Sequence, residues 1–393
     1  MKLQNFVTNK RRFLFLILCV LCAICVGKSF AQDFKTLQDG IEYAEIKRGT
    51  ETEPVKINLL RLDLTKVRLD VVHAMDAAIG TETTSSIATR HGAFAAINAG
   101  FFRLDKSIFA GDAAGVLMID GRLLSESANN RIALFISNKL KQTEVSFAHL
   151  NINELFIIKK KDFHFSGINR QSKGDELIKF TSYFHPTTLT ENHGLEIVVR
   201  NGKITEINDG KDNSPIPKDG FIISASGKMR EQILPFVKVG RKIKFRTAVT
   251  FEAKDSFPNT ESRQTSIAFS TAEDITNGVP QLIKNGKIEI TWEQEKSSKS
   301  FVETRHPRTA VAKLKDGKFL MVTVDGRQKE SVGMNLNELA ALLLELGAVN
   351  AMNLDGGGST TMFAGGKVVN NPSDKEGERK VSDAILVFPR KRN

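Results

Sequence analysis

The sequence predicts a strand-rich α+β or mixed α/β protein, with a mixed β-sheet core, few helices and a βαβ unit near the C-terminus. Asp-Gly or Asn-Gly pairs stand between alternating apolar runs at four places, which is the strongest short-range signal for a β-hairpin. Clear helical periodicity occurs in only two segments. Two near-continuous apolar runs flank the second helix, as expected for strands that are buried on both faces.

The predicted hairpins are spread along the chain. They turn at Asp120-Gly121, Asn201-Gly202, Asn285-Gly286 and Asp316-Gly317. No fixed period connects them, so we do not predict a repeat protein. The segment at about residues 139–194 is more polar, and we expect it to be an irregular elaboration of a single domain that spans residues 32–393.

Two helices are expected from periodicity and end signals. The first covers residues 84–92 and leads into the apolar strand at 93–97. The second begins after Asn335, which can cap it while Glu338 reaches back to complete a capping box. Leucines recur along it at helical spacing, and Gly347 ends it.

The first 31 residues have the pattern of a secretory signal peptide. Lys10, Arg11 and Arg12 precede an apolar run of 14 residues from Phe13 to Val26. Ser29-Phe30-Ala31 resembles a cleavage site, which predicts a cut after Ala31 and a secreted or periplasmic protein. The run is short for a membrane-spanning helix, which needs about 20 residues, and a retained N-terminal anchor is the alternative. No later segment is long and apolar enough to span a bilayer.

Composition limits the classes of partner. All three cysteines lie in the predicted leader, so no disulfide is expected in the exported chain. The leader carries five Lys/Arg and no Asp/Glu, which leaves 51 basic and 45 acidic residues and a net charge of +6. This excess suits an anionic partner such as a phosphorylated glycan. No basic block is interleaved with aromatic residues, which argues against nucleic acid. The oligomeric state does not follow from the sequence.

Two aspartates follow the strands of the predicted βαβ unit. Asp325 comes after the apolar run 319–324, and Asp355 comes after the run 348–354. Strands joined by a helical crossover run parallel in one sheet, so both carboxylates should lie at the same edge, where open α/β sheets bind ligands. Asn98 follows a third strand, and it reaches the same edge if that strand joins the same sheet.

A glycine run follows the second aspartate. Gly356, Gly357 and Gly358 allow successive backbone N–H groups to form an anion-binding nest, and Ser359 and Thr360 add hydroxyl donors. The alternative is a tight turn with positive φ, but one glycine would satisfy such a turn. The run therefore predicts a site for phosphate oxygens or for a developing oxyanion.

Four basic residues complete the predicted site. Arg308 starts the strand that pairs with 319–324 through the Asp316-Gly317 hairpin, which places it beside Asp325. Its guanidinium can bind a phosphate through two hydrogen bonds. Arg327 and Arg379 are further candidates, with a solvated surface role as the alternative. His306 is a candidate proton carrier, with a local structural role as the alternative.

Taken together, these segments resemble the phosphodiester glycosidase family, from about Asn98 to the C-terminus. The resemblance rests on "INAGFF" (97–102), "HPRTAVA" (306–312), "VDGR" (324–327), the stretch 333–362 with "NLDGGGST", and the stretch 368–387. Asp383 departs from the family pattern, which has asparagine there, and so does Ala312, where glycine is common. We expect neither departure to touch the chemistry.

The resemblance implies hydrolysis of the bond between a sugar's anomeric carbon and a phosphodiester. Asp355 or Asp325 would act as base or electrostatic partner, and Asn98 would orient the sugar. A divalent cation held by these oxygens and a metal-free site both remain open. The alternative function is a non-catalytic protein that binds a phosphorylated glycan during exopolysaccharide export or assembly, as some bacterial members of the family are described.

Overall fold

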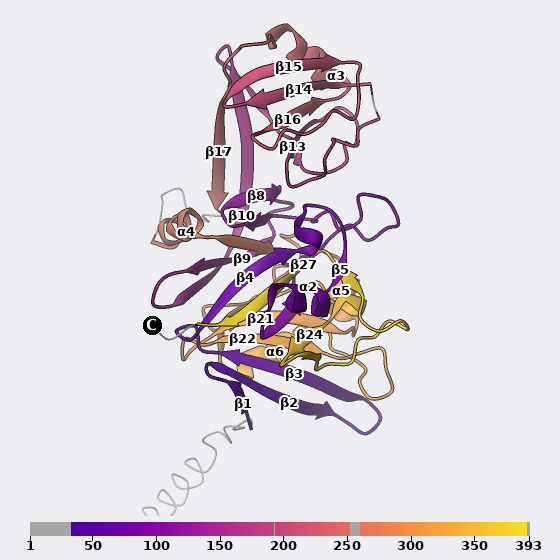
Figure 1. The fold of residues 1–393 in the computed structure, drawn as a ribbon. Coiled ribbons are helices and arrows are strands. Elements are labelled where there is room, and N and C mark those ends of the chain that lie inside the picture. Colours follow the sequence, from indigo (N-terminus) through magenta and orange to yellow (C-terminus); the bar gives the residue numbers. More distant parts are fainter. Residues whose placement is uncertain (1–32, 192, 252–259, 391–393) are drawn as a thin grey trace, which may run out of the picture. The chain divides into compact units, whose positions relative to one another are not determined.

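The computed structural model describes residues 33–191, 193–251 and 260–390 (Figure 1). The predicted leader lies outside these residues, so the signal peptide remains a prediction. The described residues are rich in strands with few helices, which confirms the predicted fold class. Their α-helices are α2 (Thr84–His91), α3 (Lys228–Ile233), α4 (Thr260–Thr271), α5 (Lys299–Glu303) and α6 (Leu336–Glu345), and short 3-10 helices are η1 (Ala74–Asp76), η2 (Leu234–Phe236) and η3 (Gly357–Ser359).

An eight-stranded sheet, which we call the main sheet, holds the C-terminal βαβ unit. Its neighbours are all antiparallel. In spatial order its strands are β1 (Lys35–Gln38), β2 (Ile41–Gly49), β3 (Pro54–Leu62), β22 (Phe319–Val324), β21 (Arg308–Leu314), β23 (Ala348–Asn353), β19 (Gln281–Lys284) and β20 (Lys287–Ile288).

The unit β22–α6–β23 has the predicted order of strand, helix and strand. Both strands pair antiparallel with β21, which lies between them, so β22 and β23 run in the same direction. Helix α6 begins at the predicted capping box, in which Asn335 and Glu338 exchange hydrogen bonds. Gly347 follows the helix with φ of +88°, as its predicted stop signal requires.

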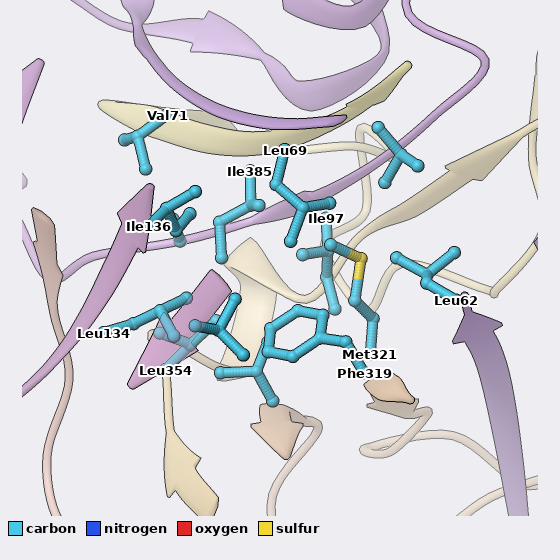
Figure 2. Packing of buried hydrophobic residues seen from close by; sticks show 14 of the residues in the cluster. Leu62, Leu69, Val71, Ile97, Leu134, Ile136, Phe319, Met321, Leu354 and Ile385 are labelled. Atoms are coloured by element: carbon cyan, nitrogen blue, oxygen red, sulfur yellow. The ribbon is translucent and has the colours of Figure 1, made fainter. Parts of the chain in front are cut away.

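A five-stranded sheet, the covering sheet, shares a hydrophobic core with the main sheet. Figure 2 shows Ile97 and Ile385 of the covering sheet beside Phe319 and Met321 of the main sheet. Apolar side chains from both sheets are fully buried there, which removes them from water and stabilises the pairing of the layers. In order, its strands are β25 (Lys367–Val368), β24 (Met362–Ala364), β6 (Ala95–Asn98), β27 (Asp383–Pro389) and β4 (Val67–His73).

Strand β10 (Thr143–Ile158) belongs to a third, seven-stranded sheet and pairs with different strands along its length. Its first residues pair with β9 (Ile132–Asn138), and its later ones pair with β11 (Lys161–His164) and β17 (Lys244–Phe251). The same sheet continues through β18 (Asp274–Asn277), β7 (Leu117–Ile119) and β8 (Arg122–Ser125). The segment at 139–194, expected to be irregular, thus contains a strand of 16 residues.

A five-stranded sheet, here the accessory sheet, packs against the end of β10 and against β11 in one apolar cluster (magenta in Figure 1). Its strands, in order, are β12 (Gly167–Ile168), β13 (Leu177–Thr181), β16 (Gly220–Ala225), β14 (Leu195–Arg200) and β15 (Lys203–Asp209). A small two-stranded sheet joins β26 (Lys380–Val381) to β5 (Glu82–Thr83). Whether these parts make one domain over residues 32–393 remains a prediction.

All four predicted hairpins are present. Asn201-Gly202, Asn285-Gly286 and Asp120-Gly121 have positive φ at both residues, as a two-residue turn of type I′ requires. At Asp316-Gly317 only the glycine has positive φ. The first predicted helix is also present as α2, and Gly92 ends it with φ of +67°.

No helix in the described part of the chain combines the length and the apolar character needed to cross a bilayer.

Candidate active site

The ends of three strands meet at one edge of the main sheet, which we call the rim. Arg308, the first residue of β21, pairs with Val324, the last residue of β22. The Leu354 amide, just past β23, donates to the carbonyl oxygen of Thr309 at 2.9 Å. Arg308, Asp325 and Asp355 therefore leave the sheet at the same edge, as the crossover predicted.

Asn98 reaches the rim by a different route from the one considered in the sequence analysis. Strand β6 belongs to the covering sheet and not to the main sheet. Asn98 is buried, and its side-chain Nδ2 donates to the backbone carbonyl oxygen of Asp355 at 2.6 Å. Its Oδ1 accepts from the Thr309 hydroxyl at 2.9 Å and from the backbone N–H of Thr361 at 3.1 Å. Asn98 thus ties the Asp355 loop to both sheets.

Asp325 is turned into the protein interior and is only 1% exposed. Its Oδ1 accepts from Asn370 Nδ2 at 3.2 Å and from the Asn371 amide at 3.0 Å, while its buried Oδ2 has no partner among the described residues. Burial raises the pKa of this carboxyl, and the two hydrogen bonds oppose that rise. An acid held in this way is well placed to support the rim but poorly placed to meet a substrate.

Asp355 is only partly buried and lies at the start of the glycine run. Its Oδ1 accepts from the Gly356 amide at 3.0 Å. Burial raises its pKa to about 6, against the lowering effects of the Ser359 hydroxyl, the Gly356 amide and the Arg379 charge. The Ser359 hydroxyl acts here by proximity, because it completes no well-formed hydrogen bond to a described residue. Near neutral pH this carboxyl can change its protonation state readily.

Asp383 is the acid that raises the pKa of Asp355 by like-charge repulsion. It is 1% exposed, and it accepts from the Gly100 amide at 3.2 Å and from the Thr276 hydroxyl at 3.0 Å. The expectation that this departure from the family pattern does not touch the chemistry directly stays a prediction. Its charge acts on the carboxyl that is best placed for the chemistry.

The glycine run does not form the open nest of amides that we expected. The Gly356 amide donates to Asp355, and the Gly357 amide donates to the Pro307 carbonyl oxygen at 2.8 Å. Of the three glycine amides, only that of Gly358 has no acceptor among the described residues. No open nest forms, because the Gly357 N–H is already bonded to Pro307, the residue before β21, and holds the loop against that strand.

The glycines are needed because other parts of the protein come very close. A Cβ at Gly356 would lie 2.8 Å from the Pro307 carbonyl oxygen, and one at Gly357, which has φ of +61°, would lie 3.0 Å from Arg327 Nη2. A Cβ at Gly358 would overlap the Arg379 guanidinium. Two of the predicted arginines thus lie directly against the glycine run.

The predicted hydroxyl donors of the cradle are buried. Thr360 is 1% exposed, and its hydroxyl oxygen accepts from Thr309 at 3.3 Å. Ser359 is fully buried. Asn370, which binds Asp325, also donates to the Thr360 carbonyl oxygen at 3.0 Å, so it connects the Asp325 loop to the Asp355 loop. These contacts bring the two predicted loops together through backbone and amide groups.

Arg308 is almost completely buried, at 1% exposure. Its Nε donates to the Met334 carbonyl oxygen at 2.9 Å, and its Nη2 donates to those of Phe301 and Thr304 at 2.8 and 2.7 Å. Nη1 has no acceptor among the described residues. Burial, followed by repulsion from Arg327, lowers the pKa of this guanidinium to about 10, so it remains charged at neutral pH.

Arg327 and His306 form a contact at the exposed side of the rim. Arg327 Nη2 lies 3.3 Å from His306 Nδ1, and Arg327 has no carboxylate partner among the described residues. Burial and the charges of Arg308 and Arg327 lower the pKa of His306, which keeps the imidazole neutral and able to accept from Arg327. His306 also pairs through its backbone with Met334, so it has the local structural role considered as an alternative.

Arg379 is already paired with an acid. Its Nε and Nη2 donate to the two carboxylate oxygens of Asp374 at 2.7 and 3.0 Å. Its charge nevertheless lowers the pKa of Asp355. We therefore assign it to the electrostatics of the loop.

Three residues near the rim, Arg131, Phe101 and Phe301, were not among the candidate site residues of the sequence analysis. The Arg131 guanidinium lies 5.7 Å from the ring centre of Phe101, and that ring packs edge-on against Phe301 at 6.2 Å. The Arg308 guanidinium lies 4.9 Å from the ring centre of Phe301. Arg131, Phe101, Phe301 and Arg308 thus form a row in which a guanidinium lies at each end of two rings. Arg131 precedes β9 in the sequence, and only the tertiary structure shows that it belongs to this row.

No group of three or more metal-binding His, Asp or Glu side chains occurs in the described residues. A site with a divalent cation and a metal-free site therefore both stay open, as in the sequence analysis. Two cavities, of about 570 and 360 Å³, are lined by other residues than those of the rim.

A model of the phosphodiester glycosidase family matches residues 193–388. The chain belongs to this family through that segment. The matched residues include Arg308, Arg327 and both aspartates of the rim, whereas Asn98 lies before them.

Two relatives of this phosphodiester glycosidase family member carry the same enzyme name. The N-acetylglucosamine-1-phosphodiester α-N-acetylglucosaminidase of Bos taurus is 40% identical over 109 residues, which cover 25% of this chain and 20% of the relative. The enzyme of that name from Homo sapiens is 31% identical over 187 residues, which cover 45% and 33%. The similarity thus spans a third or less of the length of these curated relatives.

A hypothetical protein from Synechocystis, whose crystal structure is known, has a similar fold. The TM-score is 0.75 at 24% sequence identity, and the match covers 92% of this chain and 64% of that one. This likeness concerns the fold alone, and it extends over far more of this chain than the family model does.

Proposed function

We propose that this protein is an exported hydrolase that cleaves the bond between a sugar's anomeric carbon and a phosphodiester. The products are a free sugar and a phosphate monoester. The observation that carries the proposal is Asp355, whose pKa is raised to about 6, on a rim that also holds Arg308 and Arg327. An acid poised near neutral pH beside unpaired cations suits proton transfer next to a bound phosphate.

Each rim residue has a role in this proposal. Arg327 and the Gly358 amide hold the phosphate, and the positive charge of the buried Arg308 attracts it. Neutral His306 orients Arg327 by accepting its hydrogen bond. Asp355 activates water or stabilises positive charge at the anomeric carbon. A phosphate is a good leaving group, so a second strong acid is dispensable. Asp325 and Asn98 position the loops, and Arg379 tunes Asp355.

The enzyme name shared by the relatives directs the first assay. The methyl diester of α-N-acetylglucosamine 1-phosphate is incubated with the purified protein, and free sugar is measured by chromatography. We expect turnover by the wild type and its loss in Asp355→Asn. A panel of sugar 1-phosphodiesters that bind but are never cleaved would overturn the proposal.

The structure also supports the alternative of a non-catalytic protein for phosphorylated glycans, acting in exopolysaccharide export or assembly. Two carboxylates facing a phosphate would hinder simple binding, but Asp325 is turned inward and is only 1% exposed. The rim thus presents less negative charge than the sequence suggested. Two results together would favour this alternative. The wild type would bind a diester tightly without cleaving it, and Asp355→Asn would bind the same diester more tightly.

A further inference from the structure

A cavity of about 570 Å³ lies between the loop that follows β6 and the accessory sheet. Ile108 and Phe109 line it from the loop, and Phe180 lines it from β13. The segments 188–191 and 212–213 complete its wall. It shares no lining residue with the rim, so it is a separate feature of the surface.

The cavity has an apolar floor and a polar wall. Phe109 and Phe180 are buried, at 7% and 1% exposure, while Gln171 and Asn213 are exposed at the wall. Thr188 is buried, and its hydroxyl lies 3.1 Å from that of Thr190. An aromatic floor beside hydroxyl and amide groups matches a sugar ring, which has an apolar face of C–H bonds and an edge of hydroxyls.

Two amide groups of the wall are held in one orientation. The Gln171 oxygen accepts from Arg103 Nη1 at 2.8 Å, and the Asn213 oxygen accepts from the Leu189 amide at 3.2 Å. The hydrogen-bond network therefore assigns the other end of each amide as NH₂. Neither NH₂ group has an acceptor among the described residues, so both can donate to a ligand.

The backbone of the wall is shaped before any ligand binds. Leu189 has φ of +54° and Asn213 has φ of +59°. The left-handed region is unfavourable for a bulky residue such as leucine, and such strain persists only where surrounding contacts enforce it. The Thr188 amide donates to the Ser214 carbonyl oxygen at 3.1 Å, which holds the two segments together.

The charge of the cavity is opposite to that of the rim. Glu191 and Asp212 line it, and none of its described lining residues is lysine or arginine. A phosphate would be repelled by these carboxylates. Carboxylates are, however, good acceptors for sugar hydroxyls.

We propose that this cavity is a second, non-catalytic site that binds uncharged sugar residues of a glycan. Its volume falls within the range of small-molecule sites, roughly 300–1,000 Å³. We also infer that this glycan is part of the substrate cleaved at the rim, and this second inference rests on the proposed function. The binding itself does not.

Titration calorimetry with neutral trisaccharides of glucose, mannose and N-acetylglucosamine tests the site, with inorganic phosphate as the competitor. At least one trisaccharide binds, and phosphate does not displace it. Gln171→Glu and Asn213→Asp keep the held oxygen and remove the NH₂ donor. Each should weaken binding by about fivefold, because one net hydrogen bond is lost. Binding of none of the trisaccharides, displacement by phosphate, or unchanged affinity in both variants would overturn the proposal.

A matched control accounts for the general effect of an added negative charge on the protein. Asn201→Asp makes the same change at an exposed residue with φ of +49° on the β14–β15 turn, and it should leave trisaccharide affinity unchanged. Thermal unfolding confirms that each variant is folded. Because the two sites share no residue, Gln171→Glu retains turnover of the small methyl diester and Asp355→Asn retains trisaccharide binding. The failure of one proposal is therefore distinguishable from the failure of the other.

Discussion

The rim of the main sheet and the cavity beside the accessory sheet are both polar, but they treat charge in opposite ways. The rim gathers Arg308 and Arg327, which have no carboxylate partner among the described residues, around a carboxyl whose pKa is raised. The cavity contains carboxylates and amides, and its described lining residues include no lysine or arginine. Under the two proposals above, this difference lets one chain recognise the charged and the uncharged parts of a glycan phosphate in separate places.

The two regions also differ in how their polar groups are satisfied. At the rim, Asp325 Oδ2 and the Ser359 hydroxyl are buried without partners among the described residues. In the cavity, the unpartnered NH₂ groups lie on exposed side chains, where water can satisfy them. Unsatisfied buried groups cost stability and are kept where function needs them. The rim therefore lowers the stability of the folded protein more than the cavity does.

Replacement of Asp355 tests the comparison most severely. Asp355→Asn keeps the side-chain size and removes the titrating group, so kcat for a sugar 1-phosphodiester should fall by roughly 10²- to 10⁴-fold. Asp162→Asn, a change at an exposed residue of β11, is the control and should leave kcat unaltered. If Asp355→Asn retained full activity, the rim would lose its distinction from the rest of the surface.

The second test concerns the close approach at the glycine run. In Gly358→Ala the new methyl group would overlap Arg379 and Asp374, which separates that ion pair and shifts the Asp355 loop. We expect kcat/KM to fall by about tenfold or more, because misplaced catalytic groups are costly. Thermal unfolding should also occur at a lower temperature.

Gly365→Ala provides the matched control for that test. Gly365 has φ of +58°, but its Cβ would meet no atom within 4 Å. This variant should show only the cost of backbone strain, about 1 kcal/mol, with normal kcat/KM. Equal activity losses in both variants would mean that the glycines serve the turn and not the arginines.

Arg327 provides a smaller test of the rim's positive charge. Arg327→Ala removes an exposed guanidinium, so KM should rise by about tenfold, equivalent to the loss of one charge-assisted hydrogen bond. The unfolding temperature should change little, since exposed charges contribute little to stability. A large drop in stability with unchanged KM would make Arg327 structural.

The smallest expected effect comes from Asp383. Its charge raises the pKa of Asp355, so Asp383→Asn should lower that pKa from about 6 toward its ordinary value. The limb of the kcat/KM profile that reports Asp355 would then move to lower pH, whichever protonation state is active. An unmoved profile in a folded, active variant would show that burial alone sets the pKa.

Much of the fold could be predicted because its signals are local. The capping box of Asn335 and Glu338 and the paired positive φ values at Asn201-Gly202 depend on residues within a few positions of one another. The meeting of Arg308 with the end of β22 follows from one short hairpin. Helix propensity, turn geometry and a single connection are sufficient to derive these features.

Other features depend on contacts between residues far apart in the chain, and the sequence carried no sign of them. The Gly357 amide binds Pro307, Asp325 turns inward toward Asn370, and β6 enters the covering sheet. The Arg131 guanidinium lies over the ring of Phe101, although Phe101 is 30 residues earlier in the chain. Burial and hydrogen-bond competition determine such choices only when the layers pack, because each group then pairs with whatever the fold brings near.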